Sequence, residues 1–389
     1  MIPRRLGTLS GALVLVLACD GDVHETSPAG ACTDGARCES MSALVAMSDT
    51  SSSGVGAVSL AAGAAPTSFF GVDLGKDPAL AVSRGRAFFV ARDLDAIFEV
   101  SPRCGQPLCR YSTRHAGREG TTNPQDVAVA PDSTLWVPRF GLADVAVVDA
   151  RGEIATIALP DLDGDGNPNA SAIRIVDLGG AAKAFVALER LDDRDPKFRS
   201  RGPSSLAVID VASRAFERTV ALRGRNPFNV IVEANGAFYL TDAGNFDDAA
   251  EVDAGIERID PRAPDEGGWL LAEPELGGSP SAVAVDGECG AAIIADPTLV
   301  NATAVVTFDA KVGRPLRTPT HGGALFGPTS GFDLWAIAWS EGKLLVGDRR
   351  RAGAGYPIHV FERGPGCELT ERATPLYVAQ KPVALRALP

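Results

Sequence analysis

Short stretches in which apolar and polar residues alternate recur along most of the chain, separated by turns rich in Gly, Asp and Asn. Examples are "ALAVSRGRAFFVA" after Pro78, "QDVAVAPDSTLWVPR" after Pro124 and "SAVAVDGECGAAIIA" after Pro280. Alternation with a period of two predicts β-strands with one buried face, and the 3.6-residue period of amphipathic helices is lacking. We therefore expect an all-β protein.

These stretches are grouped in repeats. Each unit has a strand, a tight turn, a second apolar strand, a variable loop, a third strand, a turn and a fourth strand. The units open at Pro78, Pro124, Ser171 (a weaker copy), Pro227, Pro280 and Phe332. Repeats of roughly 40–50 residues with four short strands are typical of β-propeller blades, and a β-sandwich does not repeat in this way.

The two ends of the repeat region predict how the ring closes. Six complete units lie within residues 78–378, and the closing "KPVALRALP" has the pattern of a first strand. Near the start, "ALVAMSDTSSSGVGAVSLAAGAAPTSFFGVDL" has the pattern of the other three strands. We expect a single seven-bladed propeller over residues 43–389, with a 3+1 last blade made by both ends. Such closure removes exposed sheet edges.

The repeat signature is similar to that of a known group of propellers. The stretches "FVARDLDAIFEVSP", "LWVPRFGLADVAVVDARG" and "AIIADPTLVNATAVVTFDAKVG" resemble YVTN-type and NHL-like bacterial propellers. The Trp-Asp and Gly-His pairs of WD40 repeats are absent. The resemblance implies the architecture and leaves the function open, because propellers host many unrelated roles.

Residues 1–18 have the pattern of a signal peptide. Arg4 and Arg5 precede a short apolar core, which is too short to span a bilayer. The core ends in "VLAC", which resembles the bacterial lipobox and implies lipidation of Cys19. Cleavage after "AGA", at residues 29–31, is the alternative.

The lipobox resemblance implies an exported protein, anchored by acyl chains and facing the periplasm or the cell surface. Residues 19–42 would form a flexible tether. Asp20 resembles an inner-membrane retention signal of enteric lipoproteins, but that rule varies between bacteria, so the choice between inner and outer membrane stays open.

The charge disfavours two classes of partner. The formal net charge is −12, and no Lys/Arg-rich stripe stands out. Nucleic-acid binding requires phosphates to be neutralised, so we exclude it, together with charge-driven adhesion to anionic lipid. We expect a monomer that contacts the membrane through its lipid anchor alone.

The cysteine count agrees with an oxidising compartment. Besides Cys19 there are six cysteines, an even number. The predicted disulfides are Cys32 with Cys38, Cys104 with Cys109, and, by elimination, Cys289 with Cys367. Zinc is the competing interpretation, but no CxxC spacing or nearby histidine favours it.

The sharpest local signal for chemistry is "DLDGDGNPNAS". It resembles the first part of a calcium-binding EF-hand loop, which implies Ca²⁺ ligands at Asp161, Asp163, Asp165, Asn167 and Asn169. Position 12 is Ala172 where the family has a bidentate Glu, so outside ligands would be needed. Asp192, Asp193 and Asp195 in the next loop are candidates. The alternative is a solvated turn with Asx-type hydrogen bonds.

Two function classes remain. The first is a cell-envelope binding or scaffold propeller for an envelope protein or a small polar ligand, with a structural Ca²⁺ loop. The second is a metal-dependent propeller enzyme, lactonase- or lyase-like, although no catalytic motif is present. Candidate residues in loops at one face of the ring are His115, Arg118, Glu119, Arg139, Arg199, Arg201, Asp242, Asn245, Asp296, Asn301 and Arg349.

Overall fold

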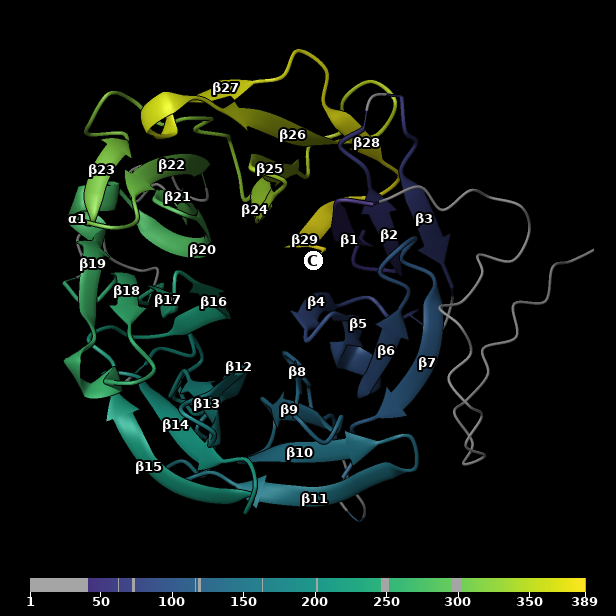
Figure 1. Ribbon diagram of the computed structural model, residues 1–389, viewed down its shortest axis with the longest axis vertical. Helices are drawn as coiled ribbons and strands as arrows, with labels where there is room; N and C mark the ends of the chain where they lie inside the picture. Colours follow the sequence, from purple (N-terminus) through teal and green to yellow (C-terminus); the bar gives the residue numbers. More distant parts are fainter. Residues whose placement is uncertain are drawn as a thin grey trace, which may run out of the picture.

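The computed structural model shows a ring of seven antiparallel sheets (Figure 1). It describes residues 41–388 except 62, 72–73, 116, 118–119, 163, 201, 246–251 and 296–301. The all-β, seven-bladed fold predicted from the repeats is confirmed. The predicted signal peptide, Cys19 and all but the last two residues of the predicted tether lie outside the described residues.

Six blades follow one another along the chain, each built from its inner to its outer strand. Blade 1 has β4 (Pro78–Ser83), β5 (Arg86–Ala91), β6 (Ala96–Val100) and β7 (Pro107–Ser112). Blade 2 has β8 (Ala128–Val129), β9 (Leu135–Arg139), β10 (Asp144–Asp149) and β11 (Gly152–Ala158). Blade 3 has β12 (Ala170–Asp177), β13 (Ala182–Leu188), β14 (Ser205–Asp210) and β15 (Ala215–Ala221).

The second half of the ring repeats the arrangement. Blade 4 has β16 (Pro227–Ala234), β17 (Ala237–Asp242), β18 (Gly255–Ile259) and β19 (Gly268–Ala272). Blade 5 has β20 (Ser279–Asp286), β21 (Cys289–Ala295), β22 (Thr303–Asp309) and β23 (Arg314–Arg317). Blade 6 has β24 (Leu334–Ser340), β25 (Lys343–Asp348), β26 (Tyr356–Arg363), β27 (Leu369–Glu371) and β28 (Leu376–Val378), which also pairs with β26.

In the part of the chain that the structure describes, helix is confined to short pieces. They are α1 (Glu273–Leu276), η2 (Arg92–Leu94), η3 (Pro264–Glu266) and η4 (Pro365–Cys367). Among the described residues, no helix is long and apolar enough to cross a membrane.

The seventh blade closes the ring in the predicted 3+1 manner. Its strands are β1 (Ala43–Ser48), β2 (Ser53–Val58), β3 (Thr67–Phe70) and the innermost β29 (Pro382–Ala387). β29 pairs antiparallel with β1, and Val45 and Leu385, which face each other in this register, are both fully buried. The C-terminal strand therefore holds the N-terminal strands in the ring.

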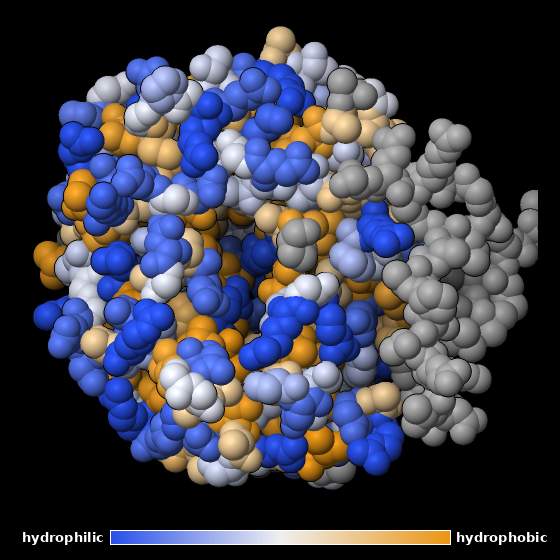
Figure 2. All heavy atoms as spheres, viewed as in Figure 1, coloured by the Kyte–Doolittle hydropathy of each residue, from blue (hydrophilic) through white to orange (hydrophobic). Residues whose placement is uncertain are grey.

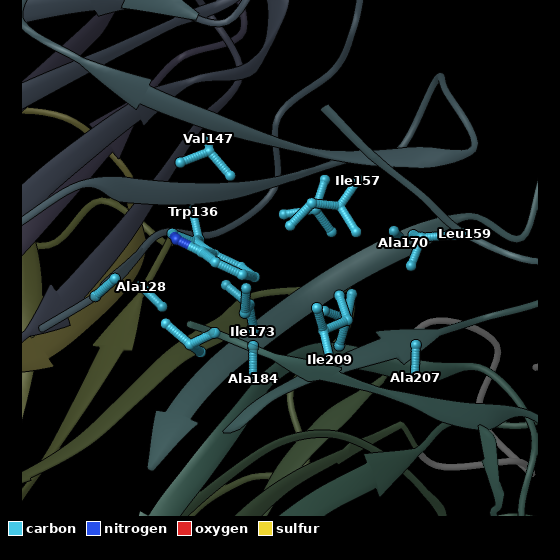
Figure 3. Packing of buried hydrophobic residues seen from close by; sticks show 14 of the residues in the cluster. Ala128, Trp136, Val147, Ile157, Leu159, Ala170, Ile173, Ala184, Ala207 and Ile209 are labelled. Carbon is cyan, nitrogen blue, oxygen red and sulfur yellow. The ribbon is translucent and has the colours of Figure 1, made fainter. Parts of the chain in front are cut away.

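The core lies between the blades. One cluster combines Trp136 of blade 2 with Ile173, Ala184 and Ile209 of blade 3 (Figure 3). Such clusters form because each strand directs alternate side chains towards the two neighbouring blades. At Gly290 an added Cβ would lie 2.1 Å from the Phe308 ring, so this position requires glycine.

A disulfide links blades 5 and 6. Cys289, at the start of β21, is bonded to Cys367 in η4, with Cα atoms 5.4 Å apart. This confirms the pair predicted by elimination. Cys104 is buried and Cys109 is half-buried; their pairing stays a prediction. Cys32 and Cys38 lie outside the described residues.

Candidate binding site in the central channel

The innermost strands surround a channel with two chambers, and the centre of the ring is visibly hollowed in Figure 2. The starts of β4, β12, β16, β24 and β29 line the upper chamber, with a cavity volume of about 210 Å³. Their ends, with β20, line the lower chamber of about 600 Å³. Arg386 of β29 lines both chambers and therefore lies where they meet.

Charged residues reach the upper chamber from one repeated position. Arg92, Glu189 and Arg349 directly follow the second strands of blades 1, 3 and 6, which are β5, β13 and β25. Because the blades share one geometry, the same step after the second strand brings each residue to the same level of the channel.

Bulges in the innermost strands supply further lining residues. The β24–β25 register shifts between Leu334 and Ala336, and the residue skipped is Trp335, which lines the upper chamber. The shifts in β12 and β16 likewise fall at Ser171 and Asn229. A bulge leaves a residue out of the ladder and re-aims its side chain, which explains why these residues face the channel.

Arg386 is a half-buried cation, and no carboxylate of the described residues is bonded to it. Its Nη1 donates to the Leu385 carbonyl at 2.7 Å, and its buried Nε has no hydrogen-bond partner among the described residues. Burial, followed by the positive charges of Arg174 and Arg92, lowers the pKa of Arg386 to about 10. The negative charge of Asp126 acts on the pKa of Arg386 in the opposite direction, but the Asp126 carboxylate is hydrogen bonded to Arg174, whose Nη1 donates to Oδ2 at 2.8 Å.

Two more guanidinium groups face the same space. Arg349 stacks over the Trp335 ring at 5.6 Å, and burial lowers the pKa of Arg349. Arg92 reaches Asp77 at 3.3 Å through Nη1, while its Nε is buried without a hydrogen-bond partner in the described structure. The cations of the chamber are thus only partly balanced.

The Glu189 carboxyl group contributes a hydrogen-bond donor to the site rather than a full negative charge. It is 6% exposed, and burial raises its pKa to about 8, although the neighbouring Ser171 and the charge of Arg92 act in the opposite direction. At pH 7 the carboxyl group is therefore mostly protonated. A neutral carboxyl group donates a hydrogen bond to an anion, whereas a carboxylate would repel it.

The electrostatic result is a positive chamber inside an acidic protein. Arg92, Arg349, Arg386 and Lys76 outweigh Asp77, which is the one lining carboxylate besides Glu189 among the described residues. This arrangement is suited to hold a small anion. The edge-to-face pair of Trp335 and Phe228, with centroids 6.2 Å apart, supplies an apolar wall beside the cations.

Most loop residues singled out from the sequence brace the ring instead. His115 Nδ1 lies 3.2 Å from Glu153, and the fully buried Arg139 pairs with Asp144 and Glu153. Asn245 accepts from Ser200 N at 3.0 Å, Arg199 pairs with Asp195, and Asp242 is fully buried. Arg349 alone of the described candidates lines the upper chamber. The candidates outside the described residues are Arg118, Glu119, Arg201, Asp296 and Asn301.

Sequence reasoning missed Arg92, Glu189 and Arg386. The first two carry a usable signal, because they follow the second strand of a repeat just as Arg349 does. The apolar stretch "FDLWAIAWS" predicts Trp335 as a blade-core residue, and this prediction is wrong. Trp335 is half-buried and lines the channel, because the bulge removes it from the alternation.

The acidic loop after β11 makes Asx-type turns. Asp161 Oδ1 accepts from Gly164 N at 2.8 Å, and Asp165 Oδ1 accepts from Asn167 N at 3.0 Å. Asp163 lies outside the described residues. Asx-type bonds of this kind were the alternative to a calcium loop.

The neighbouring loop reaches this turn through Asp193, as expected from the sequence. Asn167 and Asn169 donate from their amide groups to the Asp193 carboxylate at 2.9 and 3.0 Å, and Asn169 Oδ1 accepts from Leu191 N. These bonds brace the two loops against each other. Within the described ranges, no group of three His, Cys, Asp or Glu residues is arranged to hold a metal. Calcium binding stays a prediction.

Comparisons with known proteins identify the fold. No protein-family model matches the sequence, and no curated protein matches it. The WD40 repeats of RRP9 align over 80% of this chain and 84% of that chain, at 14% identity and a TM-score of 0.52. AztD from Citrobacter koseri aligns over 90% and 98%, at 11% identity and a TM-score of 0.50. At such identities the likeness shows the β-propeller fold alone.

Proposed function

We propose that the protein is an exported, lipid-anchored binding module that holds a small anionic molecule in the upper chamber. The observation that carries the proposal is Arg386, a half-buried guanidinium group among Arg92 and Arg174, with a buried Nε and with no carboxylate bonded to it in the described structure. Withdrawing an unpaired charge from water, even in part, costs free energy. An anion bound between Arg386 and its neighbours offsets this cost.

The size of the chamber restricts the ligand. Its volume of about 210 Å³ is below the roughly 300–1,000 Å³ of pockets for drug-sized ligands. Carboxylates and phosphates pair well with planar guanidinium groups. The ligand class is therefore a small carboxylate or phosphate compound, and the Trp335 ring fits a short apolar portion.

Calorimetric titration with inorganic phosphate and with succinate tests this proposal. We expect wild-type protein to bind at least one of the two, and Arg349→Gln to weaken that binding at least about tenfold, since a charge-assisted hydrogen bond contributes about 1.5–3 kcal/mol. Arg151→Gln is the matched control, because Arg151 is exposed and pairs with its neighbour Asp149. Equal affinity in both variants, or no binding of either anion, would overturn the proposal.

Glu189 also favours an enzyme as the second candidate. A buried carboxyl group with a pKa of about 8 beside guanidinium groups is typical of general acid–base sites. The lactonase- or lyase-like activity would then need Glu189 for proton transfer. Turnover of a lactone or hydroxy-acid panel that is lost in Glu189→Gln would support this candidate, and a panel without turnover would count against it.

Other features complete the proposal. Lipidation of Cys19, export to the periplasm or cell surface, and Ca²⁺ bound at the acidic loop belong to it, together with the resemblance to YVTN-type and NHL-like propellers. Mass spectrometry of the membrane-extracted protein tests the anchor: acyl chains on an N-terminal Cys19 are expected, and a chain beginning after Ala31 would contradict lipidation.

A further inference from the structure

The lower chamber differs chemically from the upper one. Its walls carry aliphatic side chains from the ends of the innermost strands: Val82, Ile175, Val230, Val232, Val283 and Ile337. Several of them, including Val82, Val230 and Val232, are only half-buried, so they present apolar surface to the cavity. Apolar walls in a cavity of about 600 Å³ are typical of sites for organic ligands.

Positive charge lies at the inner end of this apolar cavity. Arg386 lines it where it meets the upper chamber, and Arg174, whose charge acts on Arg386, lines the lower chamber as well. Arg174 Nη1 donates to Asp126 and to the Ile173 carbonyl, whereas Arg386 Nη1 donates to the Leu385 carbonyl, and its Nε has no hydrogen-bond partner in the described part of the chain. Glu233, the one acidic lining residue, is exposed at the strand end. The combination is a cavity whose walls carry aliphatic side chains beside polar ones such as Ser83 and Asn235, and whose floor is cationic.

The chain enters the ring beside this chamber. β1 begins at Ala43, which pairs with Ala387, and Ala387 lines the lower chamber. The predicted tether to a lipidated Cys19 therefore leaves from the lower rim. If the anchor of the proposed function is present, the lower chamber lies on the side from which the tether reaches the membrane, where single-chain amphiphiles are most concentrated.

We propose that the lower chamber is a second binding site, for an anion that carries one apolar chain. The head group lies at Arg386 and Arg174, and the chain lies along Val230, Val232 and their neighbours. Fatty carboxylates and single-chain phosphates share this chemistry. The chamber geometry carries this proposal, although the two proposed sites share one residue, because Arg386 lines both chambers.

Each chamber contains one tryptophan, which allows separate readouts. Trp339 lines the lower chamber and Trp335 the upper one. In a Trp335→Phe background, octanoate and octyl phosphate, below their micelle concentrations, should change the tryptophan fluorescence, and a further Trp339→Phe substitution should remove this signal, since Trp136 and Trp269 line neither chamber. Each buried CH₂ contributes about fourfold in affinity, so octanoate should bind at least about 20-fold more tightly than butyrate. 1-Octanol, which lacks the charge, should bind more weakly than either anion.

Val230 provides a matched pair of variants, because it lines the chamber and belongs to the bulged part of β16. We expect Val230→Asp to weaken octanoate binding at least about tenfold, and the nearly isosteric Val230→Thr to keep it within about threefold. Circular dichroism and melting curves verify that both variants fold. Equal binding of octanoate and butyrate, equal binding in both Val230 variants, or no octanoate binding would overturn the proposal.

Two variants distinguish a failure of the lower-chamber proposal from a failure of the upper-chamber proposal. Arg349→Gln should weaken phosphate or succinate binding without changing octanoate binding, because Arg349 lines the upper chamber alone. Val230→Asp should weaken octanoate binding without changing phosphate or succinate binding. If Arg349→Gln and Val230→Asp each weakened both classes equally, the channel would be one continuous site, and the second-site proposal would be wrong. The head group is identified by which of octanoate and octyl phosphate binds more tightly.

Discussion

Burial raises the pKa of two carboxyl groups, those of Glu189 and Asp242. Glu189 lies in the upper chamber, and burial raises its pKa to about 8. Asp242, at the end of β17, is fully buried, and burial followed by the charge of Glu257 raises its pKa well above the usual range. Glu257 is held as the acceptor, because its Oε1 accepts from Gly224 N at 2.7 Å.

Glu189 makes folding less favourable as the pH rises. Its folded-state pKa of about 8 lies above the usual 4.5, so the folded chain retains a proton that the unfolded chain releases between these values. We expect Glu189→Gln to have the higher free energy of unfolding, with a difference that grows from pH 4.5 to pH 8 and reaches at most about 5 kcal/mol. Urea unfolding at pH 5, 7 and 9 measures it. A difference independent of pH would contradict the raised pKa.

The raised pKa of Asp242 predicts a second loss of folding stability as the pH rises, as for Glu189. Asn at this position keeps the volume and a donor but has no proton to lose, so Asp242→Asn should be more stable than wild type at pH 9, by about 1–3 kcal/mol. Thermal melting across pH 5 to 9 shows the effect. The exposed Asp265→Asn, which loses only its pair with Arg218, is the control. A wild type that is equally stable at both ends of this pH range would contradict a protonated Asp242.

At the scale of strands, the repeat pattern predicts the order of elements better than their details. Alternation and Gly/Asp turns place the first two strands of each blade, because half-buried strands impose a period of two. The bulges of β12, β16, β20 and β24 are not readable in this way, because a bulge interrupts the period without a residue type that marks it. The residues that bulges turn into the channel were therefore missed or assigned to the core.

β29 is expected to be essential, because it is both the innermost strand of the closing blade and a wall of both chambers. Deleting residues 381–389 removes the partner of β1 and exposes buried Val45. We expect the melting temperature to fall by at least about 10 °C, since several kcal/mol of burial are lost. Differential scanning calorimetry tests this. A deletion that melts with the full-length chain would contradict 3+1 closure.

The Cys289–Cys367 disulfide closes a long loop between blades 5 and 6. With a sequence separation of 78, the chain-entropy model gives a stabilisation of about 4 kcal/mol. The Cys289→Ser/Cys367→Ser variant should unfold at correspondingly lower denaturant, and dithiothreitol should bring wild type to the same midpoint while leaving the variant unchanged. If reduction did not alter the wild-type midpoint, the bond would contribute nothing to stability.

At the scale of the whole molecule, closure of the ring brings charged residues from different blades together into one site. The fold, the blade number and the closure are predictable, because seven copies of one pattern reinforce each other. The upper chamber is not, because Arg92, Glu189 and Arg386 come from three blades and meet only when the ring closes. Their charges stand out only after burial is known, since exposed arginines are ordinary in any sequence.

The acidic loop is the remaining sequence prediction for the whole molecule. If Ca²⁺ binds the folded chain alone, it raises the melting temperature through RT ln(1 + [L]/Kd). We expect a rise in millimolar Ca²⁺ relative to EDTA that is lost in Asp161→Ala/Asp163→Ala. The same rise in that variant would assign the effect to another part of the chain, and no rise in wild type would leave a hydrogen-bonded turn braced by Asp193.

The anion site of the upper chamber is tested most directly by a crystal soaked in selenate, a tetrahedral oxyanion whose selenium scatters anomalously. We predict an anomalous peak in the upper chamber with selenate oxygens within hydrogen-bond distance of Arg386 and of Arg92 or Arg349, and its loss in Arg349→Gln crystals soaked identically. Selenate peaks confined to surface arginines such as Arg151, with an upper chamber that contains water alone, would contradict the proposed function.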